Sequence, residues 1–374
     1  MCPVLLVLLG FSGICTGDFS PPQFNISLDL PPEERWLSIA DHYDKDYLKK
    51  YAEEIIDFFV PKWVRKVISP VIELLQYFIP EPYVGEMQGV SAGFELNLAD
   101  VILLNLAYEI SGSCTSIVAQ DTNGKIYLAR NMDYLFPEIL KNITIDILYV
   151  TNGQVAYTAT TYVGYVGILT GQSPGKFSIS ANERSSGFLW ENAVSAIMLK
   201  GIPDSWLLRN TLDEAKDYKE AVQKLSNTPT IRNIYYTVAG VNPGEGVVVS
   251  RNRTGAVNML HLNPLNGEWY IVQTNYDHWT TPLTSDFRRW RTIIAMNDTQ
   301  QENITFDTLH EVLSLVPIMN RGTIHTNVMS AAFPEHYQTV VRQNIWTPMF
   351  PAVGNRSATN IESTEKYNET IIAA

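Results

Sequence analysis

The stretch SCTSIVAQDTNGKIYLARNMDY, residues 113–134, reads as two β-strands joined by one tight turn. Apolar and β-branched residues run on both sides of the central DTNG, which is typical of a β-hairpin. An Asn-Gly pair favours a two-residue type I′ turn, and counting outward from it brings Asp133 opposite Cys114. In that register Arg130 faces the other side of the sheet from Cys114, so a shared site requires a bulge, a longer turn or a bend after Arg130.

The start of the chain predicts secretion. Residues 1–17 carry the apolar run VLLVLL and end in small residues, which is typical of a signal peptide cleaved before Asp18, with a buried strand as the alternative reading. Cys2 and Cys15 leave with this peptide, so Cys114 is the one thiol of the mature chain and no intrachain disulfide can form. A lone thiol in an oxidising compartment is either buried and inert or retained for its chemistry, and the count leaves both open.

Glycosylation sites and charge agree with a lumenal protein. Seven Asn-X-Ser/Thr sequences are predicted acceptors for N-glycans, namely Asn25, Asn142, Asn252, Asn297, Asn303, Asn355 and Asn368. The formal net charge of −12 argues against nucleic acid as a partner, because phosphates select basic surfaces. An acidic composition suits an acidic compartment, where carboxylates approach protonation and histidines become charged.

Periodicity divides the mature chain at Cys114. Apolar residues at helical spacing predict helices at 46–59, 62–68, 71–79 and 96–111, the second and third separated by Pro70. Beyond Cys114, β-branched and aromatic runs predict strands at 114–120, 126–130, 143–150, 154–161, 177–180, 235–241, 246–251 and 269–273. Further helices are predicted near 191–200, 211–224, 288–296 and 305–316. This order indicates an α+β architecture of antiparallel sheets between helix layers, followed by a polar, disordered tail at 356–374.

These residues carry a family resemblance. Cys114-Thr-Ser-Ile-Val, with Arg130 and Asp133 sixteen and nineteen residues on, resembles the family of acid ceramidases and N-acylethanolamine acid amidases. The likeness covers almost the whole mature chain, through HYD (42–44), VPKWV (60–64), NLAYE (105–109), GYVG (164–167), TGQSP (170–174), WEN (190–192), NPLNGEW (263–269), TNYDHW (274–279) and VMSA (328–331). VPKWV, TGQSP and TNYDHW, together with the absence of a thiol for an inter-subunit disulfide, are more similar to the amidase branch.

The resemblance implies a fold and a maturation step. The fold is that of N-terminal-nucleophile hydrolases, an αββα sandwich of two antiparallel sheets between helix layers. Self-cleavage between Ser113 and Cys114 would give a helical α subunit, residues 18–113, and a catalytic β subunit, residues 114–355, which stay associated without a covalent link. The location implied is the lysosome. No metal and no cofactor are expected.

The resemblance also implies the catalytic roles. Cys114 attacks the amide carbonyl, its free α-amino group relays the proton to the leaving amine, and water hydrolyses the acyl-thioester. Arg130 would favour the neutral form of that amine, and Asp133 would orient it. Asn275 matches the family's oxyanion-hole residue, and Glu183 matches a site glutamate that orients groups or protonates the leaving amine.

Each of these residues has a simpler reading. Arg130 and Asp133 could form a surface ion pair, and the asparagine of TNYDHW could serve a turn. A papain-like cysteine–histidine site is the chemical rival, with His278 as its candidate base. At residues 286–289 the sequence DFRR departs from the family pattern of two acidic residues before the arginines. Phe287 therefore leaves the contribution of this motif open, and Arg288 is included as a supporting residue.

A membrane surface is a further expected partner. Apolar residues crowd the predicted helices around 55–68, beside the basic residues of 62–66. Such helices either pack against the β layers or lie on a membrane. Because acyl substrates partition into bilayers, we expect Phe58, Phe59 and Trp63 to contact an anionic lipid surface and to help deliver substrate.

The function expected from the resemblance is lysosomal hydrolysis of N-acylethanolamines, such as palmitoylethanolamide, to fatty acid and ethanolamine. Hydrolysis of ceramide to sphingosine and fatty acid is the alternative. A hypothesis of a different class is a secreted lipid carrier that keeps the fold without turnover. The combination of Cys114, Arg130, Asp133 and Asn275 favours the enzyme.

Overall fold

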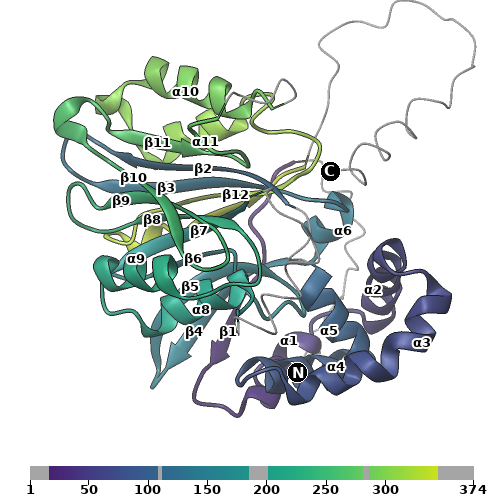
Figure 1. The fold of residues 1–374 in the computed structure, drawn as a ribbon. Coiled ribbons are helices and arrows are strands. Elements are labelled where there is room, and N and C mark those ends of the chain that lie inside the picture. The colour runs from purple at the N-terminus through teal and green to yellow at the C-terminus, as the bar shows by residue number, and fades with distance from the viewer. Residues whose placement is uncertain (1–16, 108–111, 185–200, 281–285, 344–374) are drawn as a thin grey trace, which may run out of the picture. The chain divides into compact units, whose positions relative to one another are not determined.

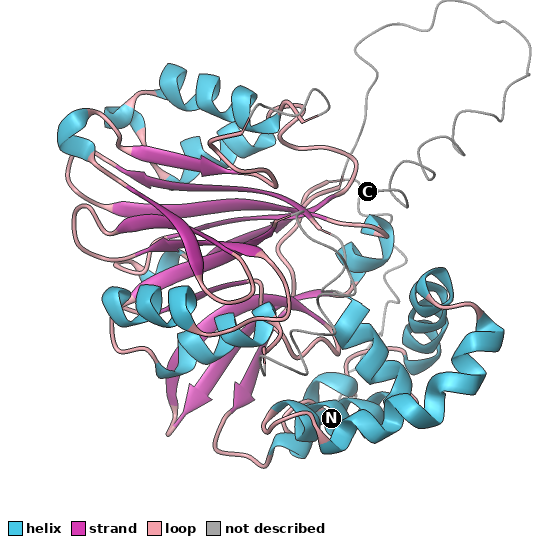
Figure 2. Ribbon diagram, viewed as in Figure 1, coloured by secondary structure: helices cyan, strands magenta, loops and turns pink. Residues whose placement is uncertain are grey.

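The computed structural model describes residues 17–107, 112–184, 201–280 and 286–343, all within the unit Met1–Asn344. Two β-sheets lie face to face in this unit, and helices cover the outer face of each (Figure 1, Figure 2). This α+β sandwich confirms the expected fold class. The predicted helix at 191–200 and the polar tail at 356–374 lie outside the described residues.

Among the described residues, the larger sheet has eight strands in the order β1-β4-β5-β6-β7-β8-β9-β10. They are β1 (Gln23–Ser27), β4 (Thr144–Thr151), β5 (Gln154–Tyr162), β6 (Thr170–Ser173), β7 (Phe177–Glu183), β8 (Ile234–Ala239), β9 (Gly246–Arg251) and β10 (Ala256–His261). Neighbouring strands pair antiparallel except β1, which runs parallel to β4. A strand from residues 18–113 therefore completes this sheet, although the sequence predicted a mostly helical region with no strand in it.

The smaller sheet of the described ranges has five strands in the order β11-β2-β3-β12-β13. They are β11 (Tyr270–Gln273), β2 (Ser113–Gln120), β3 (Ile126–Asp133), β12 (Thr323–Met329) and β13 (Gln338–Val341). Along β2, Ile117 and Ala119 pack in the cluster beneath the outer helices, whereas Val118 packs between the sheets. Ser116 and Cys114 share the face of Val118, and the Ser116 hydroxyl reaches β7 of the other sheet. Cys114 thus faces the space between the two sheets.

The β2–β3 hairpin has a different register from the predicted one. A three-residue loop closes it, in which Gly124 adopts a φ of +86°, a left-handed conformation that glycine permits. Cys114 consequently pairs with Met132, and the predicted pairing with Asp133 is wrong. Because the shift is by one residue, it turns Arg130 to the same face as Cys114. The longer turn is thus the way in which the two side chains come to share a site.

Helices α10 (Arg288–Thr299) and α11 (Phe306–Ser314) cover the smaller sheet, and α8 (Asp204–Glu214) and α9 (Tyr218–Asn227) cover the larger one (Figure 1). The one helix predicted at 211–224 is thus two, because Asp217 caps a new helix by accepting a hydrogen bond from the Glu220 N–H. Thr305 begins α11 with a capping box. The short helix α6 (Pro137–Asn142) follows β3.

The N-terminal helices form a separate group beside the sandwich. They are α1 (Leu37–Ala40), α2 (Lys45–Phe59), α3 (Lys62–Glu73), α4 (Tyr83–Phe94) and α5 (Leu98–Ala107). The predicted break at Pro70 is wrong, since α3 continues through it. Pro70 removes the hydrogen bond to the Lys66 carbonyl, but both residues are exposed, so water can satisfy that carbonyl. No helix within the described ranges is both long enough and apolar enough to cross a bilayer.

A buried polar cluster joins the two sheets. Asp146 Oδ1 accepts hydrogen bonds from Thr160 Oγ1 at 2.6 Å and from Thr339 Oγ1 at 2.8 Å. Asn327 Nδ2 donates to the same two threonine oxygens, at 2.8 and 2.7 Å. Burial raises the pKa of Asp146 to about 7, against the lowering effect of its two hydroxyl donors. This carboxyl group is therefore neutral in an acidic compartment.

Candidate active site

The Cys114 sulfur lies in a closed site between the sheets. The residue is 3% exposed, and Arg130 Nη2 donates to Sγ at 2.8 Å. Arg130 is itself fully buried, and its Nη1 donates to the Leu169 carbonyl at 2.8 Å and to the Thr170 hydroxyl. The larger sheet thus fixes a guanidinium beside a thiol of the smaller one. Met132 Sδ lies 3.7 Å from Sγ and closes the site on the side of β3.

Burial and charge oppose each other at this thiol. Burial raises the pKa of the Cys114 thiol. The charges of Arg130 and Arg288 lower this pKa, and the Asp133 carboxylate raises it, so that the net shift is upward. A thiol in this state is inert until a base takes its proton. The site therefore holds a potential nucleophile whose activation depends on one more group.

The main chain on both sides of Ser113 is held by two side chains. Asn275 Oδ1 accepts a hydrogen bond from the Cys114 N–H at 2.8 Å, and Asn275 Nδ2 donates to the Gly112 carbonyl at 3.2 Å. Glu183 accepts from the Gly112 N–H at 2.7 Å. Asn275 Nδ2 also donates to the Glu183 carbonyl at 2.9 Å, which joins the two holding residues. The Ser113–Cys114 peptide bond is thus fixed beside the buried sulfur.

Arg288 is more central than the sequence indicated. Its Nη1 donates to the Cys114 carbonyl at 3.1 Å and to Asp133 Oδ2 at 3.2 Å, and its Nη2 donates to Asn275 Oδ1 at 3.0 Å. Asp286 fixes this guanidinium by accepting from Nε at 2.9 Å and from Nη2 at 2.8 Å. One acidic residue therefore suffices to hold Arg288, and Phe287 beside it is exposed.

Asp133 lies on the helix side of the smaller sheet, opposite Ser113. It accepts hydrogen bonds from Thr323 Oγ1 at 2.6 Å and from Asn320 Nδ2 at 2.8 Å, in addition to the Arg288 contact. Burial raises its pKa although Arg288 and these donors lower it. In this uncleaved chain Asp133 acts on the Cys114 main chain through Arg288.

Glu183 ends β7 and is nearly enclosed. Burial raises its pKa, and the charge of Arg232 and the hydrogen bond from Gly112 lower it in part. A carboxyl group with a raised pKa keeps its proton in acid and can donate it. This property suits a group placed beside a leaving amine.

Two residues that sequence reasoning missed tie the holding residues together. Arg184 follows Glu183, and Asp277 lies two residues after Asn275. Asp277 accepts from Arg184 Nε at 2.7 Å and from Nη2 at 2.8 Å, and the Tyr235 hydroxyl donates to it at 2.5 Å. This two-bond ion pair fixes the end of β7 against the TNYDHW segment. The acidic residue inside that motif was the available signal.

The histidine of TNYDHW has a different environment from the thiol. The His278 ring packs edge-on against Trp279, with centroids 4.7 Å apart. Burial and the nearby Arg289 lower its pKa. The group on the Cys114 sulfur is the guanidinium of Arg130, which does not support the papain-like alternative.

The predicted glycosylation sites within the described ranges are on the surface. Those exposed are Asn25, Asn142, Asn252, Asn297 and Asn303. Asn355 and Asn368 lie outside the described residues.

Two family models match different parts of this chain. One, described as the beta subunit of N-acylethanolamine-hydrolyzing acid amidase, matches residues 19–79. The other, described as linear amide C–N hydrolases of the choloylglycine hydrolase family, matches residues 114–293 and so begins at Cys114. The protein class that these matches indicate is that of linear amide hydrolases. The first model names the N-terminal part of the chain the beta subunit, whereas the resemblance named it the α subunit. We therefore call residues 18–113 the N-terminal segment and residues from Cys114 onward the C-terminal segment.

Individual relatives extend the match over nearly the whole chain. N-acylethanolamine-hydrolyzing acid amidase of Mus musculus is 47% identical over 343 residues, 90% of this chain and 94% of that protein. Acid ceramidase of Bos taurus is 35% identical over 328 residues, 82% of each. The solved structure of a Caenorhabditis elegans ortholog of the amidase has a TM-score of 0.57 at 37% identity, covering 62% of this chain and 100% of that one. This chain belongs to the N-acylethanolamine-hydrolyzing acid amidase family.

The placement of Arg130 predicts the reactivity of Cys114. Replacing Arg130 by leucine removes the cation beside the sulfur, so we expect the thiol pKa to rise further and the thiolate fraction at a given pH to fall about tenfold or more. The rate at which a small methanethiosulfonate modifies Cys114, followed by intact mass over a pH series, measures this change. Arg291→Leu on α10 is the matched loss of a cation and should leave the rate unchanged. Equal rates in Arg130→Leu and wild type would contradict this role.

Proposed function

We propose that this enzyme cleaves its own chain between Ser113 and Cys114 and then hydrolyses N-acylethanolamines to fatty acid and ethanolamine. The observation that carries the proposal is the fixed peptide bond beside a buried thiol. Asn275 binds the main chain on both sides of Ser113, and Arg130 holds the sulfur. Membership of the amidase family supports the same reaction class.

Self-cleavage uses the position of the thiol. The Cys114 sulfur and the Ser113 carbonyl carbon are separated by three atoms of Cys114, so attack closes a five-membered ring. A carbon–sulfur bond forms, the carbon–nitrogen bond breaks, and the proton of the Cys114 thiol is transferred to the departing nitrogen. Water then hydrolyses the thioester and leaves a carboxylate on Ser113 and a free amine on Cys114.

The new α-amino group supplies the missing base. Its unperturbed pKa of about 7.7 to 8.0 leaves it protonated in acid. Arg130 lies at the sulfur, and Arg288 binds the carbonyl of the same residue, so two guanidinium groups favour the neutral amine. A neutral amine takes the proton of the Cys114 thiol within one residue and allows the sulfur to attack the substrate amide.

Cleavage also frees a donor for the substrate. In the uncleaved chain Asn275 Nδ2 donates to the Gly112 carbonyl. When the new chain end moves away, one N–H of Asn275 becomes available for the oxyanion of the tetrahedral intermediate, a contact that contributes roughly 3 to 4 kcal/mol elsewhere. Glu183 loses its Gly112 partner in the same step and is left to protonate ethanolamine as it leaves.

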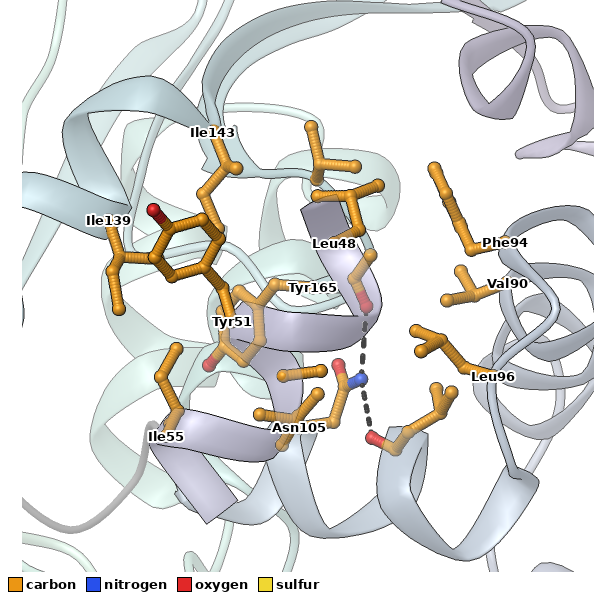
Figure 3. Close-up of a pocket in the computed structure, with 15 residues that line it drawn as sticks. Leu48, Tyr51, Ile55, Val90, Phe94, Leu96, Asn105, Ile139, Ile143 and Tyr165 are labelled. Carbon is orange, nitrogen blue, oxygen red and sulfur yellow. Dashed lines mark hydrogen bonds between the residues drawn. The ribbon is translucent and has the colours of Figure 1, made fainter. Parts of the chain in front are cut away.

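An apolar cavity between the two segments supports an acyl substrate. Its walls come from α2, α4 and α5 of the N-terminal segment and from α6 and the loop after β5 of the C-terminal segment (Figure 3). Figure 3 shows Tyr51 and Ile139 on one side of the space and Val90 and Phe94 on the other. Asn105 is a polar wall residue, and its amide is engaged by main-chain groups. A space of this kind favours a hydrocarbon chain over a polar ligand.

Two walls of this cavity are close along the chain to residues that surround Cys114. Helix α6 begins four residues after Asp133, and Tyr165 of the loop precedes Leu169, whose carbonyl holds Arg130. An acyl chain in the cavity can therefore present its carbonyl toward Cys114. The 47% identity with the mouse amidase, against 35% with bovine acid ceramidase, favours N-acylethanolamine over ceramide.

The proposed setting is the lysosomal lumen, with both segments remaining associated without a covalent link and with N-glycans on the exposed acceptor asparagines. Cys114 is a free thiol, buried between the sheets. The raised pKa values of Asp146, Asp133 and Glu183 agree with a protein that works in acid.

An exposed apolar stripe on α3 supports contact with an anionic membrane. Trp63 is 74% exposed and Val67 70%, and Phe58 at the end of α2 is 57% exposed. Further exposed apolar residues follow at helical spacing: Val71, Leu74 and Phe78. Phe59, by contrast, is half-buried against the core. Among the basic residues nearby, Lys62 and Lys66 are exposed. This surface combines apolar side chains with cations, as membrane-surface helices do.

Turnover and processing test the proposed function together. In acid, the wild type should yield a fragment that starts at Cys114 and should cleave palmitoylethanolamide, whereas Cys114→Ala should remain one chain and be inactive. Intact mass and fatty-acid release measure the two events. Cutting of Cys114→Ala at the same bond would refute self-processing. Faster release from a short-chain ceramide than from palmitoylethanolamide would favour the alternative substrate.

The cavity predicts a chain-length effect. Ala52→Trp places a large side chain in the space, so we expect turnover of palmitoylethanolamide to fall about tenfold or more while turnover of the hexanoyl analogue changes little. Glu53→Trp adds the same group on the exposed side of α2 and serves as the matched control. A parallel loss for both chain lengths in Ala52→Trp would argue against an acyl chain in this cavity.

Liposome cosedimentation tests the membrane surface. Serine at Phe58, Trp63 and Val67 removes three exposed apolar groups, so we expect binding to anionic vesicles at acid pH to fall roughly tenfold or more. Serine at Val257 and Leu265, which are 48% and 99% exposed on the C-terminal segment, is the control. Equal binding by the wild type and the triple variant would refute this surface as the contact.

A further inference from the structure

A buried ion pair joins the two segments far from the Cys114 site along the chain. Glu86 of α4 is fully buried, and Arg209 of α8 donates to it through Nη1 at 2.7 Å and Nη2 at 2.6 Å. Glu86 belongs to the N-terminal segment and Arg209 to the C-terminal segment. The Glu86 carboxylate also accepts from Arg35 Nη1 at 2.9 Å and from Trp36 Nε1 at 3.0 Å. Four N–H donors therefore satisfy one buried carboxylate.

Both partners are fixed by their own segment. In the N-terminal segment, Arg35 donates to the Leu28 carbonyl at 2.8 Å, and this bond fixes the guanidinium that binds Glu86. Arg209 donates to the Val166 carbonyl at 2.9 Å and lies over the ring of Tyr149 at 4.9 Å. Because each half is held in place, little ordering is needed when they meet.

Aromatic packing surrounds the pair and excludes water. Tyr83 of the N-terminal segment stacks on Trp206 of the C-terminal segment, with centroids 4.2 Å apart and an interplanar angle of 7°. The Tyr83 hydroxyl donates to the Trp206 carbonyl at 3.0 Å. Charge pairs in such a setting are screened little by salt.

The charge state of Glu86 suits an acidic compartment. Burial alone would raise its pKa, but the charge of Arg209 and the hydrogen bonds from Arg209, Trp36 and Arg35 outweigh burial, and the pKa lies below its usual value. The other titratable groups around the pair are the phenols of Tyr83, Tyr149 and Tyr157, which are neutral in acid, and the carboxyl group of Asp213. Burial raises the pKa of Asp213, and the charges of Arg209 and Arg35 lower it in part.

We propose that the Glu86–Arg209 pair is the anchor that keeps the N-terminal segment bound after the chain is cut before Cys114. This inference rests on the proposed self-cleavage. In the uncut chain the two segments meet at a high effective concentration, so their contact needs little affinity of its own. After the cut they are two molecules, and the interface must hold them. Loss of the N-terminal segment would remove α2, α4 and α5 from the apolar cavity.

The pair differs from a second ion pair that also joins the segments. Asp18 accepts from Arg342, whose side chain is 3% exposed, but the Asp18 side chain is 38% exposed and open to water. Arg342 also donates to the hydroxyls of Thr326 and Ser314, so it keeps partners when the Asp18 charge is removed. Solvent-exposed pairs contribute little, whereas a buried charge that loses its partner is left uncompensated. Removal of the Glu86 charge should therefore matter far more than removal of the Asp18 charge.

The experiment measures association after cleavage. Wild type, Glu86→Gln, Asp18→Asn and Glu95→Gln are incubated in acid and then diluted in series. Denaturing gels report the cut, and native mass spectrometry reports whether the two segments stay together. Glu95 is the matched control, because it pairs with Lys45 and Lys49 inside the N-terminal segment. We expect Glu86→Gln to raise the dissociation constant roughly hundredfold or more, and both controls to behave as the wild type.

Two further arms separate misfolding and failed cleavage from the inference. Trp36→Phe keeps the carboxylate and removes one of its four donors, so it should weaken association by a smaller factor even if Glu86→Gln does not fold. If the chain does not cut itself, a specific protease site introduced before Cys114 makes the cut, and dilution still reports association. The inference would be overturned if the segments of Glu86→Gln dissociate at the same dilution as those of the wild type. Weakening of association by Asp18→Asn that equals the weakening by Glu86→Gln would overturn it as well.

Discussion

The pairing of Cys114 with Met132 determines which side chains meet the sulfur. Because side chains alternate along a strand, this register directs Cys114 and Arg130 into the space between the sheets and leaves Asp133 on the helix side. The sulfur and the main chain of Cys114 are therefore contacted by side chains from different layers of the fold. Arg130 acts from within the sandwich, whereas Arg288 comes from α10 outside it. A slip of one residue would exchange these environments.

The two layers divide the chemistry of one residue. Arg130 contacts the sulfur, and Asn275, Arg288 and Glu183 hold the backbone at the proposed cleavage site. In the proposed mechanism the nucleophile exists before cleavage, and the amine that serves as its base in substrate turnover is created by cleavage.

The sequence predicted more of the site than of the framework that places it. Cys114, Arg130, Asn275 and Glu183 were predicted through the family resemblance, and the structure brings them within one network. The register failed because the turn DTNG can close as a two- or three-residue loop, and local sequence does not decide between them. Strands β6, β12 and β13 were missed, since they are short or rich in threonine, asparagine and serine that hydrogen-bond across the sandwich. The two edge strands of the larger sheet, β1 and β10, were missed as well. The importance of Arg288 and the Arg184–Asp277 pair depends on contacts between distant segments, which periodicity does not reveal.

Two buried carboxyl groups give the fold opposite responses to pH. The folded-state pKa of Asp146 is raised to about 7, so its contribution to stability is fully present below its unfolded value and is lost as the pH rises through about 7. The folded-state pKa of Glu86 is lowered, so its contribution is present above the unfolded value and is lost only as the pH falls through the folded one. Between these limits Asp146 is neutral where the sheets meet, and Glu86 is charged where the segments meet. In that mildly acidic interval the contribution of Glu86 is fully present, whereas the contribution of Asp146 is already partly lost and falls further as the pH approaches 7.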